Sequence, residues 1–358
     1  MTVPAHNVLG LATVSVLVGL LGWYLHRRTL TPLASGFLVA VASAGLLLMG
    51  LVSAFFYRGS SFGSIQLVTW SVFLHLPLLL VGTAVLLKSR LPTIAVGALG
   101  TAAILGIVAL DAFLIEPYWL EISQLTLQSE KLSEPIRVVV LADIQTDRPG
   151  RYEARVFEKA MAQKPDLILF AGDYIQLGRR SRSYETEVAA LRELIAGSGL
   201  SAPLGIYAVA GNVDRPGVWT RVFDGLPVET IEETERHDLG PVVLTGLGMA
   251  DAFATHRAVP REEAFHIVMG HSPNFSLGPV EGDLLIAGHT HGGQVQLPFV
   301  GPVFSLSMVP RAWASGVTEI APGQMLVVSR GIGLERSDAP RMRFMCRPEL
   351  VVIDLAPS

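Results

Sequence analysis

The chain has 358 residues, of which 50% are hydrophobic and only 16% are charged, and its mean hydropathy of +0.47 is too high for a single water-soluble globule of this size. A formal net charge of −4 excludes a broadly basic surface, so nucleic acid is not an expected partner. The single cysteine, Cys346, excludes an intrachain disulfide and any metal site built from thiolates alone.

Four apolar stretches fill the first 120 residues, and we predict that each is a membrane-spanning helix. Each is close to the ~20 residues that a ~30 Å hydrocarbon core requires at the rise of an α-helix. No basic segment precedes the first stretch, which favours a retained helix over a cleaved signal peptide. The stretches cover residues 8–25, 33–56, 65–87 and 91–114.

The basic residues of the connecting loops predict the orientation of these helices. Lysine and arginine near helix ends favour the cytoplasmic side of a membrane. The first and third loops together carry four such residues, whereas the second loop carries only Arg58. The four are Arg27, Arg28, Lys88 and Arg90. An even number of crossings then returns the chain to the outside. We therefore expect a multi-pass protein of the cell membrane, with a transmembrane anchor at residues 1–120 and an extracytoplasmic domain at 121–358.

From residue 121 onward, short apolar runs alternate with helical stretches, a pattern typical of an α/β domain. Residues 151–162 predict a crossover helix with one apolar side. Five apolar runs predict buried strands, at residues 135–142, 166–171, 206–210, 266–269 and 283–287.

Each of the five predicted strands ends at a residue that can bind a metal ion. Ligands of α/β sheets collect beyond the carboxyl ends of the strands, so these side chains should meet. A single Gly-Asp, Gly-Asn or histidine at such a place is most often part of a turn or a surface residue. The joint occurrence of all of them predicts a metal centre. Its candidate ligands are Asp143, Asp173, Asn212, His271 and, in Gly-His-Thr-His, His289 and His291.

The mixture of carboxylate, amide oxygen and imidazole suits Mn²⁺, Fe²⁺ or Zn²⁺ better than Mg²⁺, which prefers oxygen ligands and water. Two such ions ~3.5–4 Å apart can activate water and hold two phosphoryl oxygens during an in-line displacement. The ligand types therefore predict hydrolysis of a phosphoester.

These residues resemble the calcineurin-like metallophosphoesterases, and most closely their bacterial membrane-associated phosphodiesterase branch, which carries a Gly-His-Thr-His-Gly-Gly-Gln block. The likeness extends over about residues 125–355. The resemblance implies a four-layer αββα sandwich and two divalent ions. It assigns Asn212, His271 and His289 to one ion and Asp143 and His291 to the other, with Asp173 bridging them. The matching blocks are Lys164-Pro165-Asp166, His271-Ser272-Pro273, 246–251, 288–294, 329–333 and 347–350.

The chain departs from the family pattern at two positions. Where the family has Asp-x-His, this chain has Gln145, whose amide oxygen is a weaker, neutral ligand, so one ion should bind less tightly. Where the family has Gly-Asn-His-Asp, this chain has Val213, which cannot exchange a proton, and no general acid is identified. Asp147 is a candidate extra carboxylate, with a plain loop residue as the alternative. Arg341 and Arg343 are candidates for holding phosphate, with structural pairing as the alternative.

The sequence thus predicts a membrane-anchored, divalent-metal-dependent phosphohydrolase. Its expected substrate is a phosphorylated small molecule or lipid near the bilayer, carrying a phosphoester, phosphodiester or pyrophosphate. The alternative is a degenerate member of the fold that binds metal or phospholipid without turnover. The sequence gives no expectation for the oligomeric state.

Overall fold

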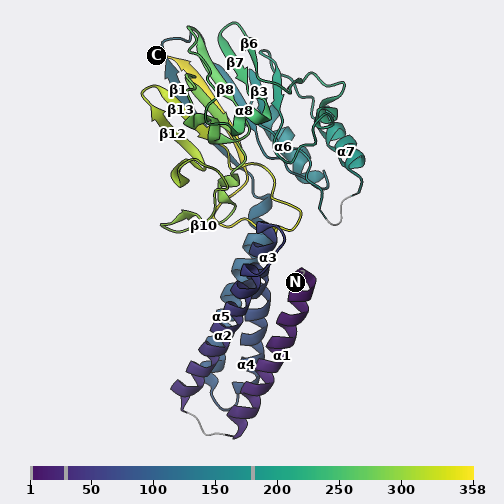
Figure 1. Cartoon of the computed structure of the whole chain (residues 1–358), viewed down its shortest axis with the longest axis vertical. Coiled ribbons are helices and arrows are strands. Elements are labelled where there is room, and N and C mark those ends of the chain that lie inside the picture. The colour runs from purple at the N-terminus through teal and green to yellow at the C-terminus, as the bar shows by residue number, and fades with distance from the viewer. Residues whose placement is uncertain (1–2, 28–30, 179–181) are drawn as a thin grey trace. The chain divides into compact units, whose positions relative to one another are not determined.

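The computed structural model describes residues 3–27, 31–178 and 182–358, and it divides into two compact units (Figure 1). One unit comprises Met1–Leu114 with Asp338–Pro340, and the other Ile115–Ser337 with Arg341–Ser358. We call them the helical unit and the α/β unit. Arg28, which entered the charge comparison of the loops, lies outside the described residues.

The helical unit contains long apolar helices. Within the part of the chain that the structure describes, four are long and apolar enough to cross a membrane, at Ala5–Tyr24, Pro32–Phe55, Ser61–Leu87 and Pro92–Tyr118. The four predicted spans are thus confirmed as helices. The third is interrupted by a π-helical turn. The elements are α1 (Val3–Arg27), α2 (Pro32–Phe55), α3 (Ser61–Trp70), η1 (Ser71–His75), α4 (Leu76–Leu87), α5 (Pro92–Leu110) and η2 (Asp111–Ile115). The short η3 (Glu116–Tyr118) that follows them belongs to the α/β unit.

The α/β unit contains two six-stranded sheets, labelled in Figure 1. The first has the order β1-β14-β2-β3-β4-β5, in which β2 to β5 run parallel. Its strands are β1 (Glu121–Ser129), β2 (Ile136–Leu141), β3 (Leu167–Phe170), β4 (Ile206–Val209), β5 (Glu229–Ile231) and β14 (Glu349–Pro357).

The second sheet has the order β12-β13-β9-β8-β7-β6, in which β7, β8, β9 and β13 run parallel. Its strands are β6 (Glu235–Asp238), β7 (Val242–Gly246), β8 (Phe265–Met269), β9 (Leu284–Ala287), β12 (Gly316–Ala321) and β13 (Gln324–Val328). A small hairpin pairs β10 (Gln296–Leu297) with β11 (Gly301–Pro302). The helices are α6 (Arg151–Ala162), α7 (Tyr184–Gly197), α8 (Met249–Phe253), η4 (Trp219–Phe223), η5 (Pro273–Leu277), η6 (His291–Gly293) and η7 (Arg311–Trp313).

Alternating side chains of the strands build the layers. Val138 and Leu169 of the first sheet share one apolar cluster with Ile267 and Ile286 of the second, so the two sheets pack face to face. The opposite face of the first sheet packs against α6 and α7, and that of the second packs against α8 and η5. The predicted αββα sandwich is confirmed, and the five predicted strands and the helix at 151–162 agree with β2, β3, β4, β8, β9 and α6.

Candidate metal centre

The structure brings the predicted ligands together at the carboxyl ends of β2, β3, β4, β8 and β9. Ligand atoms of Asp143, Asp173 and His291 all lie within 4.8 Å of one another, and all three residues are buried. His271 joins them, because its Nε2 is 3.3 Å from Asp173 Oδ2 and 3.1 Å from Asn212 Oδ1. The parallel strands end at one edge, and face-to-face packing of the sheets completes the cluster.

Hydrogen bonds orient two of the imidazoles. The Nδ1–H of His271 donates to the carbonyl oxygen of Ala171 at 2.8 Å, which turns Nε2 toward Asp173 and Asn212 as the nitrogen that can bind a cation. The Nε2–H of His289 donates to the carbonyl oxygen of Leu306 at 3.2 Å, so its free atom is Nδ1. A carbonyl oxygen can only accept a hydrogen bond, so the ring nitrogen that faces it must carry the proton in each histidine. Both rings are thereby set to bind a cation through the other nitrogen.

Buried polar atoms without partners show that this set of residues fits a cation. Both ring nitrogens of His291, which is 5% exposed, and the Oε1 atom of Gln145, which is fully buried, have no hydrogen-bond partner among the described residues. An unsatisfied buried polar atom costs about 1–3 kcal/mol. Coordination to a metal ion would satisfy the Gln145 oxygen and one of the two ring nitrogens of His291.

The backbone is strained at the same residues. Five of the seven predicted ligands have φ in the left-handed region, between +36° and +69°. Such conformations cost of the order of 1–3 kcal/mol per residue and persist where the surroundings enforce them, often at functional sites. The five are Asp143, Gln145, Asp173, His289 and His291.

Glycines permit the close approach of the strand ends. A Cβ on Gly288 would lie 2.6 Å from Asp143 Oδ2, and one on Gly211 would lie 2.1 Å from Asp173 Oδ1. Each of these glycines precedes a predicted ligand and touches the carboxylate of another. A side chain at either position would push the ligands apart.

The pKa values reflect this crowding. Burial, together with the negative charge of Asp173, raises the pKa of Asp143 to about 7. Burial lowers the pKa of His271, but the charges of Asp173 and Asp143 outweigh it and bring it to about 9. Burial, with the positive charge of His271, lowers the pKa of His289 to about 4. The carboxylates therefore favour a positive charge in their midst, and a proton on His271 supplies it when no cation does.

These shifts predict a pH-dependent effect of Asp143→Asn on the metal-free full chain in detergent. The folded pKa of about 7 lies above the ordinary 3.8 of the unfolded chain. Between these two pH values, folded Asp143 keeps a proton that the unfolded chain has lost. The stability of the wild type therefore falls as the pH rises from about 3.8 to about 7. Asparagine resembles the protonated acid. The substitution should raise the midpoint of thermal unfolding at both pH values, and by clearly more at pH 8 than at pH 5. An equal gain at both pH values, or the same gain from exposed Asp238→Asn, would contradict this interpretation.

A polar network that the sequence did not reveal holds Gln145. Its Nε2 donates to Glu335 Oε2 at 2.9 Å and to Gln176 Oε1 at 3.1 Å, and Gln176 Nε2 donates to Glu335 Oε1 at 2.6 Å. The amide nitrogen is thus engaged while the amide oxygen stays free. Glu335 follows the matched block at 329–333 by two residues, which was its only signal in the sequence.

We expect Gln145→His to strengthen the weaker metal site. Its imidazole would find in Glu335 a carboxylate that can accept the second ring N–H, as in many metal-bound histidines. Mn²⁺ should bind to this site about tenfold or more tightly, as measured by titration of the metal-free full chain. Exposed Gln128→His on β1 is the matched control, and equal titrations of the two variants would contradict the assignment.

Asp214 is a second residue that sequence reasoning did not single out, although it stands in the Gly-Asn-Val-Asp block. Its carboxylate accepts backbone N–H groups of Gly211, Asp173 and Tyr174, at 2.8–2.9 Å. It thereby joins the loops that follow β3 and β4. Asp214 thereby positions the predicted ligands of these two loops, Asp173 and Asn212.

For the two loop arginines, the structure favours structural pairing, which the sequence left open as the alternative to phosphate binding. Arg343 does not hold phosphate, because it is fully buried and its guanidinium donates to backbone carbonyls of Arg330, Gly331, Gly333 and Cys346. Arg341 pairs with Asp147, which also lies 3.6 Å from Arg336. Structural pairing therefore accounts for both arginines, and Asp147 is engaged by Arg341 and Arg336.

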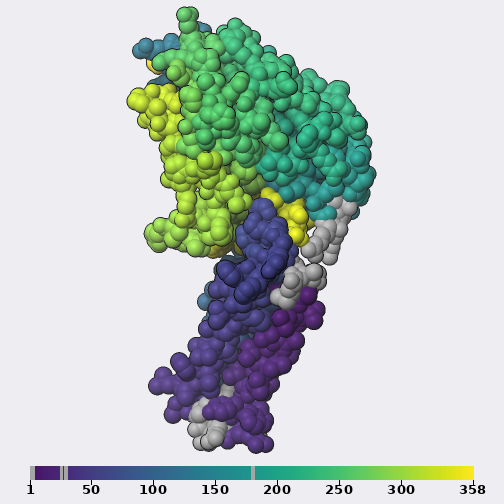
Figure 2. Space-filling model, viewed as in Figure 1, coloured from purple at the N-terminus to yellow at the C-terminus, as the bar shows by residue number. Residues whose placement is uncertain are grey.

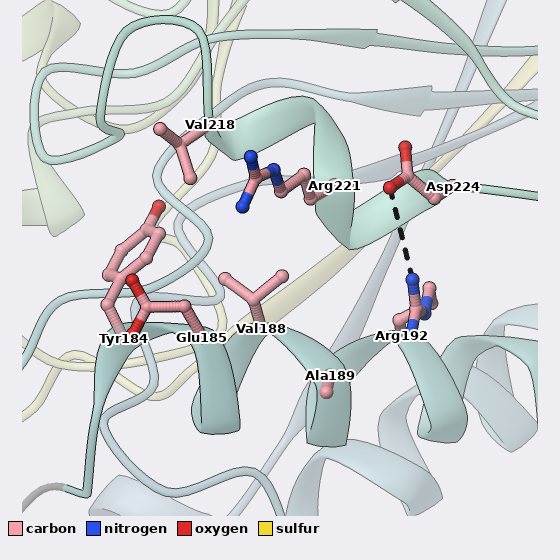
Figure 3. Close-up of a pocket in the computed structure, with 8 residues that line it drawn as sticks. All are labelled: Tyr184, Glu185, Val188, Ala189, Arg192, Val218, Arg221 and Asp224. Carbon is pink, nitrogen blue, oxygen red and sulfur yellow. Dashed lines mark ion pairs between the residues drawn. The ribbon is translucent and has the colours of Figure 1, made fainter.

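A pocket of about 130 Å³ lies elsewhere in the α/β unit, between α7 and η4 (Figure 3). Figure 3 shows Arg221 pointing into it and Arg192 paired with Asp224 at 3.9 Å across its edge. None of the predicted ligands lines this pocket. Its exposed ion pair is typical of a protein surface, so the strand ends remain the candidate site.

Comparison with known proteins connects this geometry to a family. Residues 136–293 match the calcineurin-like phosphoesterase family. The chain is 26% identical over 261 residues to the uncharacterized metallophosphoesterase YkuE of Bacillus subtilis, an alignment covering 67% of this chain and 87% of the relative. It is 27% identical to the phosphodiesterase YaeI of Escherichia coli, covering 67% and 90%. It is 23% identical to the UDP-2,3-diacylglucosamine pyrophosphatase LpxG of Chlamydia muridarum, covering 61% and 83%. The chain carries a calcineurin-like metallophosphoesterase domain.

Proposed function

We propose that this protein is a membrane-anchored, divalent-metal-dependent phosphohydrolase. The observation that carries the proposal is the buried cluster of Asp143, Asp173 and His291, in which neither imidazole nitrogen has a hydrogen-bond partner among the described residues. Relatives named as a phosphodiesterase and as a pyrophosphatase support the same class of reaction. Four helices long and apolar enough to cross a membrane support the anchor.

For the ligands, we propose two ions that share Asp173. Asn212, His271 through Nε2 and His289 through Nδ1 would hold one ion, and Asp143, His291 and the free oxygen of Gln145 would hold the other. Mn²⁺, Fe²⁺ and Zn²⁺ suit these donors. When bound, the ions supply Lewis-acid stabilisation of phosphoryl charge and lower the pKa of a water.

The residues around the site favour a substrate with a weakly basic leaving group. The backbone N–H of Val213 donates to Asp173 Oδ1 at 2.9 Å, which fixes position 213 beside the cluster, but its side chain has no proton to give. A leaving phosphate needs little protonation, whereas an alkoxide needs a general acid. The site therefore favours a pyrophosphate or an activated ester over a simple alkyl ester.

We also propose that the α/β unit faces the outside of the cell, because the basic residues concentrate in the first and third loops. This orientation argues against a UDP-linked substrate like that named for LpxG, since nucleotide sugars are cytoplasmic. Protection of the α/β unit from protease in right-side-out vesicles would contradict it.

The alternative function is binding of metal or phospholipid without turnover, and the two departures at Gln145 and Val213 favour it. Hydrolysis of an aryl phosphodiester by the purified full chain separates the two. We expect Mn²⁺ to support hydrolysis and a chelator to abolish it, with recovery when Mn²⁺ is restored. A rate that equals the background with Mn²⁺, Fe²⁺ and Zn²⁺ alike would reject the enzyme in favour of the binding protein.

A further inference from the structure

The α/β unit exposes one uncharged apolar segment, residues 296–308, which contains β10 and β11 and which we call the apolar hairpin. No Asp, Glu, Lys or Arg lies between Asp283 and Arg311. The light green segment that contains it projects from the surface of the unit in Figure 2. Exposed apolar groups that gather in this way mark interaction sites in soluble and membrane proteins alike. The exposed side chains are those of Leu297, Phe299, Val300, Phe304, Leu306 and Met308.

The backbone of the hairpin presents two of these side chains in a strained conformation. Phe299 has φ +65° and is fully exposed, and Leu306 has φ +48°. A bulky residue in the left-handed region is an outlier, and strained residues of this kind cluster at functional sites. No described residue of the α/β unit covers the Phe299 ring, so contacts within the unit do not explain why this side chain is presented outward.

The hairpin is attached to the rim of the metal centre. The carbonyl oxygen of Leu306 accepts the ring N–H of His289 at 3.2 Å. The Ser307 hydroxyl and the Met308 N–H donate to Asn274 Oδ1 at 2.7 and 2.8 Å, which fixes the far end of the hairpin next to η5. Whatever binds the apolar side chains is therefore held beside the candidate ligands.

The base of the hairpin is also bonded to the end of the fourth candidate span. The fourth candidate span ends at Tyr118, and the carboxylate of Glu116 accepts the backbone N–H groups of Met345, at 2.8 Å, and of Cys346. Phe344, the preceding residue, exchanges backbone hydrogen bonds of 2.9 Å with Gln294 and Gln296. Two hydrogen-bonded steps thus connect the end of the span to β10.

The residues at the end of this span have the character of a membrane interface. Tyr118 and Trp119 are about half exposed, and the Arg347 guanidinium lies 3.7 Å from the centre of the Trp119 ring. Exposed aromatic rings beside basic groups are typical of the headgroup region. These residues and the hairpin belong to the same α/β unit.

We propose that the apolar hairpin inserts into the interface of the bilayer, so that the metal centre receives its phosphorylated group from a membrane lipid. The uncharged sequence, the exposed rings and the bonds to the end of the fourth candidate span favour lipid over a second copy of the chain or another protein. The lipid substrate rests on the proposed phosphohydrolase function, whereas insertion does not.

The first test measures insertion without activity. The full-length Phe299→Cys variant is labelled with an environment-sensitive fluorophore and reconstituted in phosphatidylcholine vesicles with or without nitroxide-labelled phosphatidylcholine. Cys346 is buried, so the wild type gives the labelling background, and Glu193→Cys, exposed on α7, is the matched control. We expect nitroxide lipid to quench the label at 299 and to spare the label at 193. Equal quenching at the two positions, or a label at 299 shielded from water but not quenched by lipid, would overturn insertion.

The second test measures the substrate. The variant Phe299→Asn with Val300→Ser removes two apolar side chains, and asparagine tolerates the left-handed backbone. We expect its KM for a lipid pyrophosphate in vesicles to rise about tenfold, with hydrolysis of a soluble aryl phosphodiester unchanged. An unchanged KM would overturn the role of the hairpin in substrate capture. Failure of the wild type to hydrolyse both the lipid pyrophosphate and the soluble diester would instead reject the phosphohydrolase function and leave the fluorescence result standing.

Discussion

Replacing Asp173 with alanine should lower the rate of aryl phosphodiester hydrolysis by the full chain with Mn²⁺ about 10³-fold. The carboxylate is the one that we propose to share between both ions, and it also accepts the Val213 N–H at 2.9 Å and lies 3.3 Å from His271 Nε2. Metal-ion catalysis contributes several kcal/mol to the transition state, and each 1.36 kcal/mol is tenfold in rate.

A matched control separates loss of the centre from general damage. His237 belongs to a second group of metal-ligand side chains, with Glu229 and Glu235, but that group lies at the surface on β5 and β6. His237→Ala should therefore retain activity. Asp173→Asn keeps the shape of the side chain and should lose activity while the protein remains folded, as judged by its unfolding midpoint. An active Asp173→Asn variant would exclude the proposed role of this carboxylate.

The fold was predictable because the signals for it are local. Each buried strand is a short apolar run that stops at a polar residue, and β2, β3 and β9 lie where those runs predicted them. The helix at 151–162 has an apolar side, and its observed ends coincide with the predicted ones. Convergence of the candidate ligands followed from the general placement of sites at the carboxyl ends of parallel strands.

The features of the site that could not be predicted from the sequence depend on contacts between separate segments of the chain. Arg343 looked like a phosphate ligand because guanidinium groups suit phosphate, yet loops 10–13 residues away in the chain supply carbonyls that occupy it. Glu335 reaches Gln145 across 190 positions. The left-handed φ of Asp143 and His289 also cannot be predicted from residue type, because neither residue is glycine and the surrounding packing imposes the conformation.

Val213→His should raise activity, and the size of the gain should depend on the leaving group. A general acid contributes about 10²-fold or more where the departing oxygen is strongly basic. We therefore expect a gain of about 10²-fold for an alkyl phosphodiester and little gain for an aryl phosphodiester or a pyrophosphate, whose leaving groups need little protonation. Steady-state kinetics with the three substrates under Mn²⁺ measure this pattern.

The substitution should leave the backbone in place, because the N–H of residue 213 donates to Asp173 Oδ1 whatever the side chain. Val213→Asn is the matched control, since it is polar but cannot act as an acid near neutral pH. A gain with histidine that is equal for all three leaving groups would mean that the imidazole acts through binding or metal affinity. No gain with any of them would mean that another group already protonates the leaving oxygen, and the preference for a weakly basic leaving group would then be wrong.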